Sequence, residues 1–444
     1  MIEIHAVGGY DEVGKNCTMI RVDDEAIIID MGLHLPNYIS YTEEEGEDVR
    51  KFTRKELKQA GAIPDDTKIV GFKSIVKAII PTHGHLDHIG AIPYLANQYG
   101  CDIYGTPFTC AVLRRILKDE KIHIRNRINV ININSTHKIS DKMTIQFISA
   151  THSIPHATML AVHTPYGIVL YTNDFKFDKT PTIGKKPNYE ALEKLGKKGV
   201  LAVIVDALYS DADIKTPSEA VAKEMLKEVM LGVNSKNKAV IVTTFSSHIA
   251  RLKSIVEFGK QMNRKILFLG RSLSKYAKAA SDVNLYNFDK EVNIVGGGKR
   301  VKMALQKILK KQRDKYLLVV TGHQGEPKAV LSKMANKLHP FEFQKEDHVI
   351  FSCKTIPTQI NREYREKLES QLKDYGVRIF KRIHVSGHAA REDLRDLINM
   401  VKPLHIIPAH ATREQSNALV DLAYEMGFVD EQIHHLKNQH KLVF

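Results

Sequence analysis

The sequence predicts an α/β protein in which a β-rich domain is interrupted by an insert of alternating strands and helices and then resumes. Three observations support this prediction. Short β-type runs separated by Gly- or Asp-bearing turns fill most of the first half of the chain. From about residue 200 the pattern changes to strand–helix alternation, which is typical of a largely parallel sheet. Positive charge is concentrated in that same middle region.

The first half supplies the strands of the β-rich domain. Residues 3–7, 17–22 and 26–30 are predicted strands, and an apolar run over residues 76–81 predicts a buried strand. Helical patterns follow at residues 89–98 and 109–118. Further strands are predicted at residues 130–133, 143–149, 157–163 and 168–172, the last two joined as a hairpin at Pro165-Tyr166-Gly167.

The second half repeats a strand–helix unit. Predicted strands at residues 201–205, 239–243, 265–269 and 316–320 are followed by predicted helices at residues 218–230, 247–261, 272–280 and 327–338. Strands at residues 348–352 and 377–381 and two more strand–helix steps complete the chain. We therefore expect a first domain over residues 1–208, an insert over residues 209–359 and a return to the first domain over residues 360–444.

Composition limits the class of protein. The chain has 444 residues, and no apolar run approaches the length of a membrane span. The N-terminus lacks a signal-peptide pattern. The four cysteines are scattered without a Cys-x-x-Cys pair, which argues against a disulfide framework and favours a reducing, cytoplasmic location.

The distribution of charge predicts a polyanionic partner. The net charge is +14. Residues 209–359 hold 27 Lys and Arg residues against 14 Asp and Glu residues, a net charge of +13, so the rest of the chain carries only +1. A role of charged residues in solubility does not explain why the positive charge is concentrated in one region. Binding of a polyanion such as a nucleic acid does explain it.

A dense histidine loop predicts a metal site. His83, His85, Asp87 and His88 lie in one short loop between the strand predicted at residues 76–81 and the helix that follows. Imidazole and carboxylate are ligands that zinc and similar divalent metals prefer. His83 and His85 can point to one side of extended backbone, while Asp87 and His88 can face a second ion. The alternative is a polar turn with solvated histidines, which so dense a cluster disfavours.

Two metals need more ligands than one loop offers, and the later sequence supplies them at strand ends. His152, Asp174 and His410 each follow a predicted strand. Taken singly, each could be a cap or a surface residue. Their combination with the histidine loop indicates a two-metal site.

With these residues in place, the chain resembles metallo-β-lactamase-fold nucleases of the β-CASP group. Asp206, Ser386-Gly387-His388-Ala389 and Ile407-Pro408-Ala409-His410 resemble the three additional motifs of that group, in the right order. Within the group the chain is most similar to the ribonuclease J family, in its short archaeal form. That likeness lies in Leu269-Gly270-Arg271-Ser272 and in residues 244–251 and 321–327. The resemblance implies a metallo-β-lactamase αββα sandwich with an inserted α/β β-CASP domain.

The resemblance also implies roles for individual residues. His83, His85 and His152 would bind one zinc ion, Asp87, His88 and His410 a second, and Asp174 would bridge the two. Mn²⁺ or Mg²⁺ is the alternative metal. Asp30 and Asp206 would orient ligands, and the catalytic set would be His388, Asp174 and Asp206, with His388 protonating the leaving oxygen. The expected RNA- or phosphate-binding residues are Ser386, Gly387, His388, Ala389, Arg271 and Ser272.

The function implied is hydrolysis of single-stranded RNA in RNA decay and maturation. The expected activity is 5′→3′ exonucleolytic, favours 5′-monophosphate ends and includes endonucleolytic cuts; a homodimer is one assembly to consider. The alternatives are a processing endonuclease of the cleavage-and-polyadenylation type, a hydrolase of small thioesters or lactones, a DNA-processing β-CASP nuclease and an inactive scaffold. The DNA-processing branch usually carries valine at the position of His410, and a scaffold would not keep every expected ligand.

Overall fold

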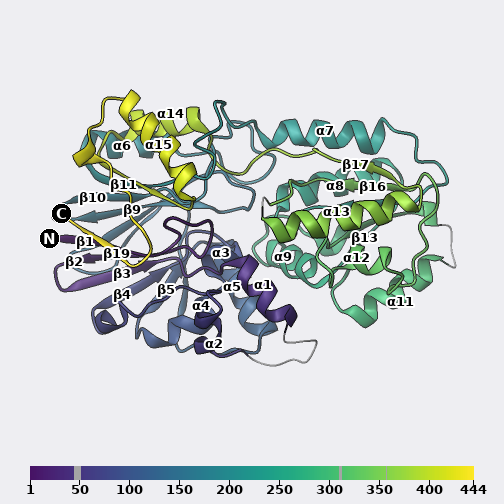
Figure 1. Ribbon diagram of the computed structural model, residues 1–444, viewed down its shortest axis with the longest axis horizontal. Coiled ribbons are helices and arrows are strands. Elements are labelled where there is room, and N and C mark those ends of the chain that lie inside the picture. The colour runs from purple at the N-terminus through teal and green to yellow at the C-terminus, as the bar shows by residue number, and fades with distance from the viewer. Residues whose placement is uncertain (45–51, 310–312, 357) are drawn as a thin grey trace. The chain divides into compact units, whose positions relative to one another are not determined.

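A computed structural model describes residues 1–44, 52–309, 313–356 and 358–444 (Figure 1). The chain forms two compact units. The first unit comprises Met1–Lys179, Gly184–Thr216 and Ser386–Phe444, and the second unit comprises Thr180–Ile183 and Pro217–Val385. The second unit is therefore an insertion in the sequence of the first.

The first unit contains two β-sheets. In one, seven strands have the order β19-β1-β2-β3-β4-β5-β6. In the other, six strands have the order β18-β11-β10-β9-β8-β7. The first sheet consists of β1 (Ile2–Gly8), β2 (Cys17–Val22), β3 (Glu25–Ile29), β4 (Val76–Ile80), β5 (Asp102–Gly105), β6 (Ile128–Val130) and β19 (His440–Val443). The second consists of β7 (Thr136–Lys138), β8 (Thr144–Ser149), β9 (Thr158–Thr164), β10 (Gly167–Tyr171), β11 (Val200–Asp206) and β18 (Pro403–Ala409).

Alternation along the strands explains why the two sheets pack against each other. Phe147 of β8 lies in a buried cluster with Ile4 and Ile27 of the first sheet, whereas its neighbour Ile148 belongs to a different buried cluster. That second cluster covers the outer face of the second sheet with residues of α6 (Tyr189–Lys198), α14 (Arg391–Val401) and α15 (Arg413–Glu425). Successive side chains of a strand point to opposite faces, so a strand that is apolar throughout needs cover on both sides.

Helices of the N-terminal half lie along the first sheet (Figure 1). They are α1 (Leu35–Glu44), α2 (Arg54–Gln59), α3 (Leu86–Ile89), α4 (Ile92–Leu95) and α5 (Pro107–Asp119). With α6, α14 and α15 on the other side, the first unit is an αββα sandwich. The predicted fold class is confirmed.

The second unit is built on one parallel sheet of the order β14-β13-β15-β12-β16-β17, in which every neighbouring pair is parallel. Its strands are β12 (Val240–Thr243), β13 (Lys265–Leu269), β14 (Asn293–Val295), β15 (Tyr316–Val320), β16 (His348–Phe351) and β17 (Arg378–Phe380). Its helices are α7 (Glu219–Leu231), α8 (Ile249–Gln261), α9 (Arg271–Asp282), α10 (Phe288–Glu291), α11 (Gly298–Leu309), α12 (Val330–Ala335) and α13 (Gln359–Asp374).

Three predicted elements differ from the structure in extent. The helix predicted at residues 89–98 is divided among α3, α4 and a short 3₁₀ turn, and the helix predicted at residues 327–338 is only α12. The insert predicted to end at residue 359 continues in the second unit to Val385. The reason is that β17 pairs with β16, and α13 packs Leu368 and Leu372 into the core of that unit.

Two further observations concern location. Within the described residues, no helix is long and apolar enough to cross a lipid bilayer. Cys17, Cys101, Cys110 and Cys353 are all buried and free.

Candidate metal centre

The seven residues predicted to bind metal all belong to the first unit and form two overlapping groups. β10, β11 and β18 run parallel to one another, so the residues that follow them meet at one edge of the second sheet. Within each group, one ligand atom per residue lies within 4.8 Å of every other. We call His83, His85, His152 and Asp174 the first ligand group, and Asp87, His88, Asp174 and His410 the second ligand group.

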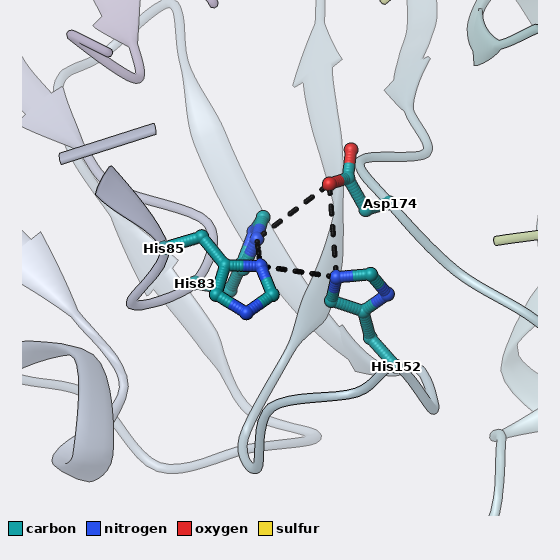
Figure 2. Close-up of side chains that lie close together, drawn as sticks. All are labelled: His83, His85, His152 and Asp174. Atoms are coloured by element: carbon teal, nitrogen blue, oxygen red, sulfur yellow. Dashed lines mark hydrogen bonds and ion pairs between the residues drawn. The ribbon is translucent and has the colours of Figure 1, made fainter. Parts of the chain in front are cut away.

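In the first ligand group, ring nitrogens of three histidines converge (Figure 2). Nε2 of His83 and Nε2 of His152 lie 3.0 and 3.1 Å from Nδ1 of His85. Oδ2 of Asp174 lies 3.7 Å from Nε2 of both His83 and His152. Zinc–nitrogen bonds of tetrahedral sites place ligand nitrogens about 3.4 Å apart. The spacing therefore fits one zinc-sized ion.

The protonation of these histidines suits metal binding. Burial, reinforced by neighbouring imidazoles, holds the pKa of His83 and of His152 well below the usual value. Burial also lowers the pKa of His85 to about 4. Nδ1 of His152 donates to the carbonyl oxygen of Gly387 at 2.7 Å, and this leaves a lone pair on Nε2. The three rings are neutral near pH 7 and can act as ligands.

The second ligand group is arranged around the same aspartate. Oδ2 of Asp174 lies 3.2 Å from Nε2 of His88 and 4.0 Å from Nε2 of His410. Nε2 of His88 also lies 3.8 Å from Oδ2 of Asp87. Asp174 is thus the residue common to both groups, as a bridging ligand would be.

One atom of Asp174 lacks a partner. The side chain is 2 % exposed, and Oδ1 has no hydrogen-bond partner among the described residues. A buried carboxylate oxygen without a partner is costly, and a bound cation removes that cost. The orphaned oxygen and the converging lone pairs show that the residues present fit divalent metal ions.

Asp30 holds the histidine loop in place. It follows β3 at a φ of 58° and is fully buried. Oδ1 accepts from the backbone N–H of Thr82 at 2.8 Å, and Oδ2 accepts from Nδ1 of His88 at 2.7 Å. The hydroxyl of Thr82 donates to the same carboxylate. Asp30 therefore fixes the orientation of His88 and holds the loop next to His83.

His388 and Asp206 form a pair beside the ligand groups. Nδ1 of His388 donates to Oδ2 of Asp206 at 2.7 Å, and the ring of His388 stacks on that of His410 with centroids 5.5 Å apart. Burial opposes the charge on His388, but Asp206 and Asp174 outweigh it and raise the pKa of His388 to about 9. His388 therefore carries a proton near pH 7.

The predicted phosphate-binding residues fall into two places. Ser386, Gly387 and Ala389 lie in the first unit with His388, where Ser386 Oγ accepts from the His388 N–H at 3.0 Å. A Cβ on Gly387 would lie 2.8 Å from Nδ1 of His152, so only glycine fits there. Arg271 and Ser272 begin α9 in the second unit. The roles predicted for all these residues stay predictions.

Sequence reasoning missed one residue that touches the second ligand group. Asn16 is 1 % exposed and contacts both His88 and His410. It lies just before β2, and no metal-ligand pattern marks it, because an amide is an uncommon ligand. Only the proximity of Asn16 N–H to the carbonyl of Asp87, 71 residues away, brings it into the site.

Comparison with known families defines the class of protein. Residues 71–227 match the beta-lactamase superfamily domain, residues 237–365 match the Ribonuclease J beta-CASP domain, and residues 375–435 match the Zn-dependent metallo-hydrolase RNA specificity domain. The last match suggests RNA binding. A crystal structure of a protein of unknown function from Enterococcus faecalis V583 has the same fold, with a TM-score of 0.66, 16% identity and full coverage of both chains. Fold and site thus define a metallo-hydrolase with His/Asp groups that can bind metal.

Sequence relatives define the family. The chain is 44% identical to Ribonuclease J of Methanocaldococcus jannaschii, over 100% of this chain and 99% of that protein. It is 40% identical to Ribonuclease J of Pyrococcus abyssi, over 97% and 94% of the two chains. Ribonuclease J2 of Bacillus subtilis is 32% identical over 96% of this chain and 72% of its own length. The chain belongs to the ribonuclease J family of metal-dependent ribonucleases.

Proposed function

We propose that this protein hydrolyses the phosphodiester bonds of single-stranded RNA at a pair of divalent metal ions, from the 5′ end towards the 3′ end, and that it favours 5′-monophosphate ends. The observation that carries the proposal is the pair of His/Asp ligand groups that share the buried Asp174. Shared carboxylates are typical of two-metal sites that act on phosphodiesters.

The first unit provides the residues of the reaction. His83, His85 and His152 would hold one ion, Asp87, His88 and His410 the other, and Asp174 both. When bound, the two ions would activate a water molecule near neutral pH and neutralise charge on the phosphate. Neutral imidazoles suit this task because they bind an ion without cancelling its charge.

His388 would supply the proton for the leaving oxygen. Its pair with Asp206 raises the pKa of the ring and favours the charged form near pH 7, and Asp206 fixes which nitrogen faces away from the carboxylate. A positioned general acid contributes about 10²–10⁴-fold in rate. Ser386 and the backbone around Gly387 and Ala389 would hold the phosphate next to it.

The second unit would bind the RNA backbone. It holds 33 Lys and Arg residues against 16 Asp and Glu residues, a net charge of +17, while the first unit carries −3. Arg271 and Ser272 begin α9, where free backbone N–H groups favour an anion. Because contacts to phosphates bind without sequence preference, RNA affinity should fall steeply with salt.

Direction and end preference need a direct test. We would follow a single-stranded RNA labelled internally and at its 5′ end, bearing a 5′ monophosphate, beside its 5′-triphosphate and DNA counterparts. Immediate release of the 5′ mononucleotide, with the other two substrates resistant, is the expected result. Internal fragments that ignore the 5′ end would identify a processing endonuclease instead. Turnover of small esters alone would overturn the proposal of a nuclease.

The metal, the location and the assembly belong to the same proposal. Nitrogen-rich ligand groups favour zinc over magnesium, so metal analysis of the purified protein should find two zinc ions per chain. Four free cysteines fit a reducing cytoplasm. Light scattering of the purified chain would decide between a monomer and the proposed homodimer.

A further inference from the structure

Asn16 connects the two histidines of the second ligand group. The side chain is 1 % exposed and lies in the first unit between β1 and β2. Nδ2 lies 2.9 Å from Nε2 of His88, and Oδ1 lies 3.0 Å from Nδ1 of His410. We propose that Asn16 is a positioning residue for the second metal ion. Its hydrogen bond to His410 fixes the orientation and the tautomer of that ligand. The inference rests on the two-metal site proposed above.

The backbone holds Asn16 firmly in this position. Its N–H donates to the carbonyl oxygen of Asp87 at 3.0 Å, and its own carbonyl accepts from the N–H of Gly32 at 2.9 Å. Gly9 lies so close that a Cβ there would be 2.4 Å from Oδ1 of Asn16. The amide therefore has little freedom to move away from the histidines.

The partners of the amide decide which way it faces. Nδ2 lies 3.1 Å from the carbonyl oxygen of Asp87, which can only accept a hydrogen bond. Nδ2 must therefore be the NH₂ nitrogen, and Oδ1 is the acceptor of the amide. Nδ1 of His410 lies 2.8 Å from Nδ2 and 3.0 Å from Oδ1, and of these two atoms only Oδ1 can accept a hydrogen bond. A neutral His410 that keeps the lone pair of Nε2 for an ion carries its hydrogen on Nδ1, and Oδ1 of Asn16 accepts that hydrogen.

This assignment leaves the lone pair of His410 on Nε2, the nitrogen that faces Oδ2 of Asp174 at 4.0 Å. His88 and His388 are oriented by the carboxylates of Asp30 and Asp206. His410 is instead oriented by a neutral amide, which adds no charge to the site. Residues that orient metal ligands in this way typically contribute about 10–100-fold to metal affinity.

The test measures zinc affinity rather than activity. In Asn16→Leu the side chain keeps a similar shape but loses all hydrogen bonds, and Asn16→Ala removes the amide. Asn126→Ala is a matched control, because Asn126 is also buried in the first unit and its NH₂ donates to the carbonyls of Ala96, Tyr99 and Cys101. Each full-length protein would be stripped of metal and titrated with Zn²⁺ against a chromophoric chelator.

We expect two zinc ions in the wild type and in Asn126→Ala, and about 10- to 100-fold weaker binding of one of the two in either Asn16 variant. The other ion should bind as in the wild type. Unchanged binding of both ions in the Asn16 variants would overturn the inference and leave the two-metal proposal intact. A wild-type protein that binds only one ion would overturn both. A general loss of stability in an Asn16 variant would weaken both ions alike, which also contradicts the inference.

Discussion

Each of the two units buries a network of charged side chains. The two networks differ in whether residues of the protein satisfy all of their hydrogen-bonding atoms. In the second unit, Arg251 is fully buried, and its Nε and Nη2 donate to the carboxylate of Glu219 at 2.7 and 2.9 Å. Nη1 donates to Ser352 and to the carbonyl of Ile383. Every nitrogen of this guanidinium has an acceptor.

The network of the first unit is incomplete by the same criterion. Oδ1 of Asp174 has no hydrogen-bond partner among the described residues, and burial holds the pKa of His83 and of His152 well below the usual value. A buried polar network that is only partly satisfied is destabilising by itself. The comparison shows which network stabilises the fold and which is shaped for a cation that comes from outside.

The largest predicted effect tests this comparison at the first ligand group. His85→Ala removes the nitrogen that His83 and His152 both approach, so RNA hydrolysis should be abolished and bound zinc reduced. His163→Ala is the matched control, because His163 is a half-buried histidine of the first unit whose ring hydrogen-bonds to Gln146. Full RNA hydrolysis by His85→Ala would contradict a role of the first ligand group in the reaction.

A second prediction separates proton donation from metal binding. Asp206→Asn removes the charge that raises the pKa of His388. The ring should then lose its proton at lower pH, and the rate near pH 7 should fall, by less than the roughly 10²–10⁴-fold that a positioned general acid contributes in full. Activity that depends on a protonated His388 declines as pH rises through the pKa of that ring. The descending limb of the pH–rate profile should therefore move to lower pH in Asp206→Asn, while bound zinc stays unchanged.

Arg251 allows the opposite test in the second unit. Arg251→Met removes the guanidinium that pairs with the buried Glu219, and breaking a buried ion pair in this way costs about 3–5 kcal/mol. Hydrogen exchange of the amides in β12 and α8 should report that loss of stability, and bound zinc should not change. The double variant Arg251→Met, Glu219→Gln also removes the buried charge of Glu219 and should recover part of the stability. Equal protection in wild type and Arg251→Met would contradict the view that this network stabilises the unit.

The sequence indicated the candidate ligands of the site but not the residues that support them. The candidates could be picked out because the histidine loop is unusually dense, and the parallel strands β10, β11 and β18 bring their ends together. Asn16 could not be found, because its role depends on a contact with Asp87 that no local pattern records. His248 and Arg251 belong to a segment read as a family motif, yet the structure buries them with Glu219, which precedes them by about 30 residues.

The same long-range effect limited the boundaries of the fold. Strand–helix alternation correctly predicted a parallel sheet in the second unit, but pairing between β16 and β17 decides where that unit ends. The helix predicted at residues 89–98 is interrupted because Gly90 and Pro93 divide it. Periodicity identifies an element, whereas its limits depend on partners that lie far away in the sequence.

The smallest predicted effect is a loss of stability at acidic pH, and it distinguishes the two networks further. Burial opposes the ionisation of Glu219, but His248 and Arg251 outweigh it and hold the pKa of this carboxyl well below its usual range. A carboxyl whose pKa is lower in the folded state stabilises the fold above its unfolded pKa of about 4.3, and this contribution is lost as pH falls through the folded pKa. The stability advantage of the wild type over Glu219→Gln, measured by hydrogen exchange of α7 and α8, should be full at pH 6 and should shrink below about pH 4.3. An advantage that stays constant into acid would mean that Glu219 is not ionised in the folded protein, and the second network would then owe its stability to hydrogen bonds alone.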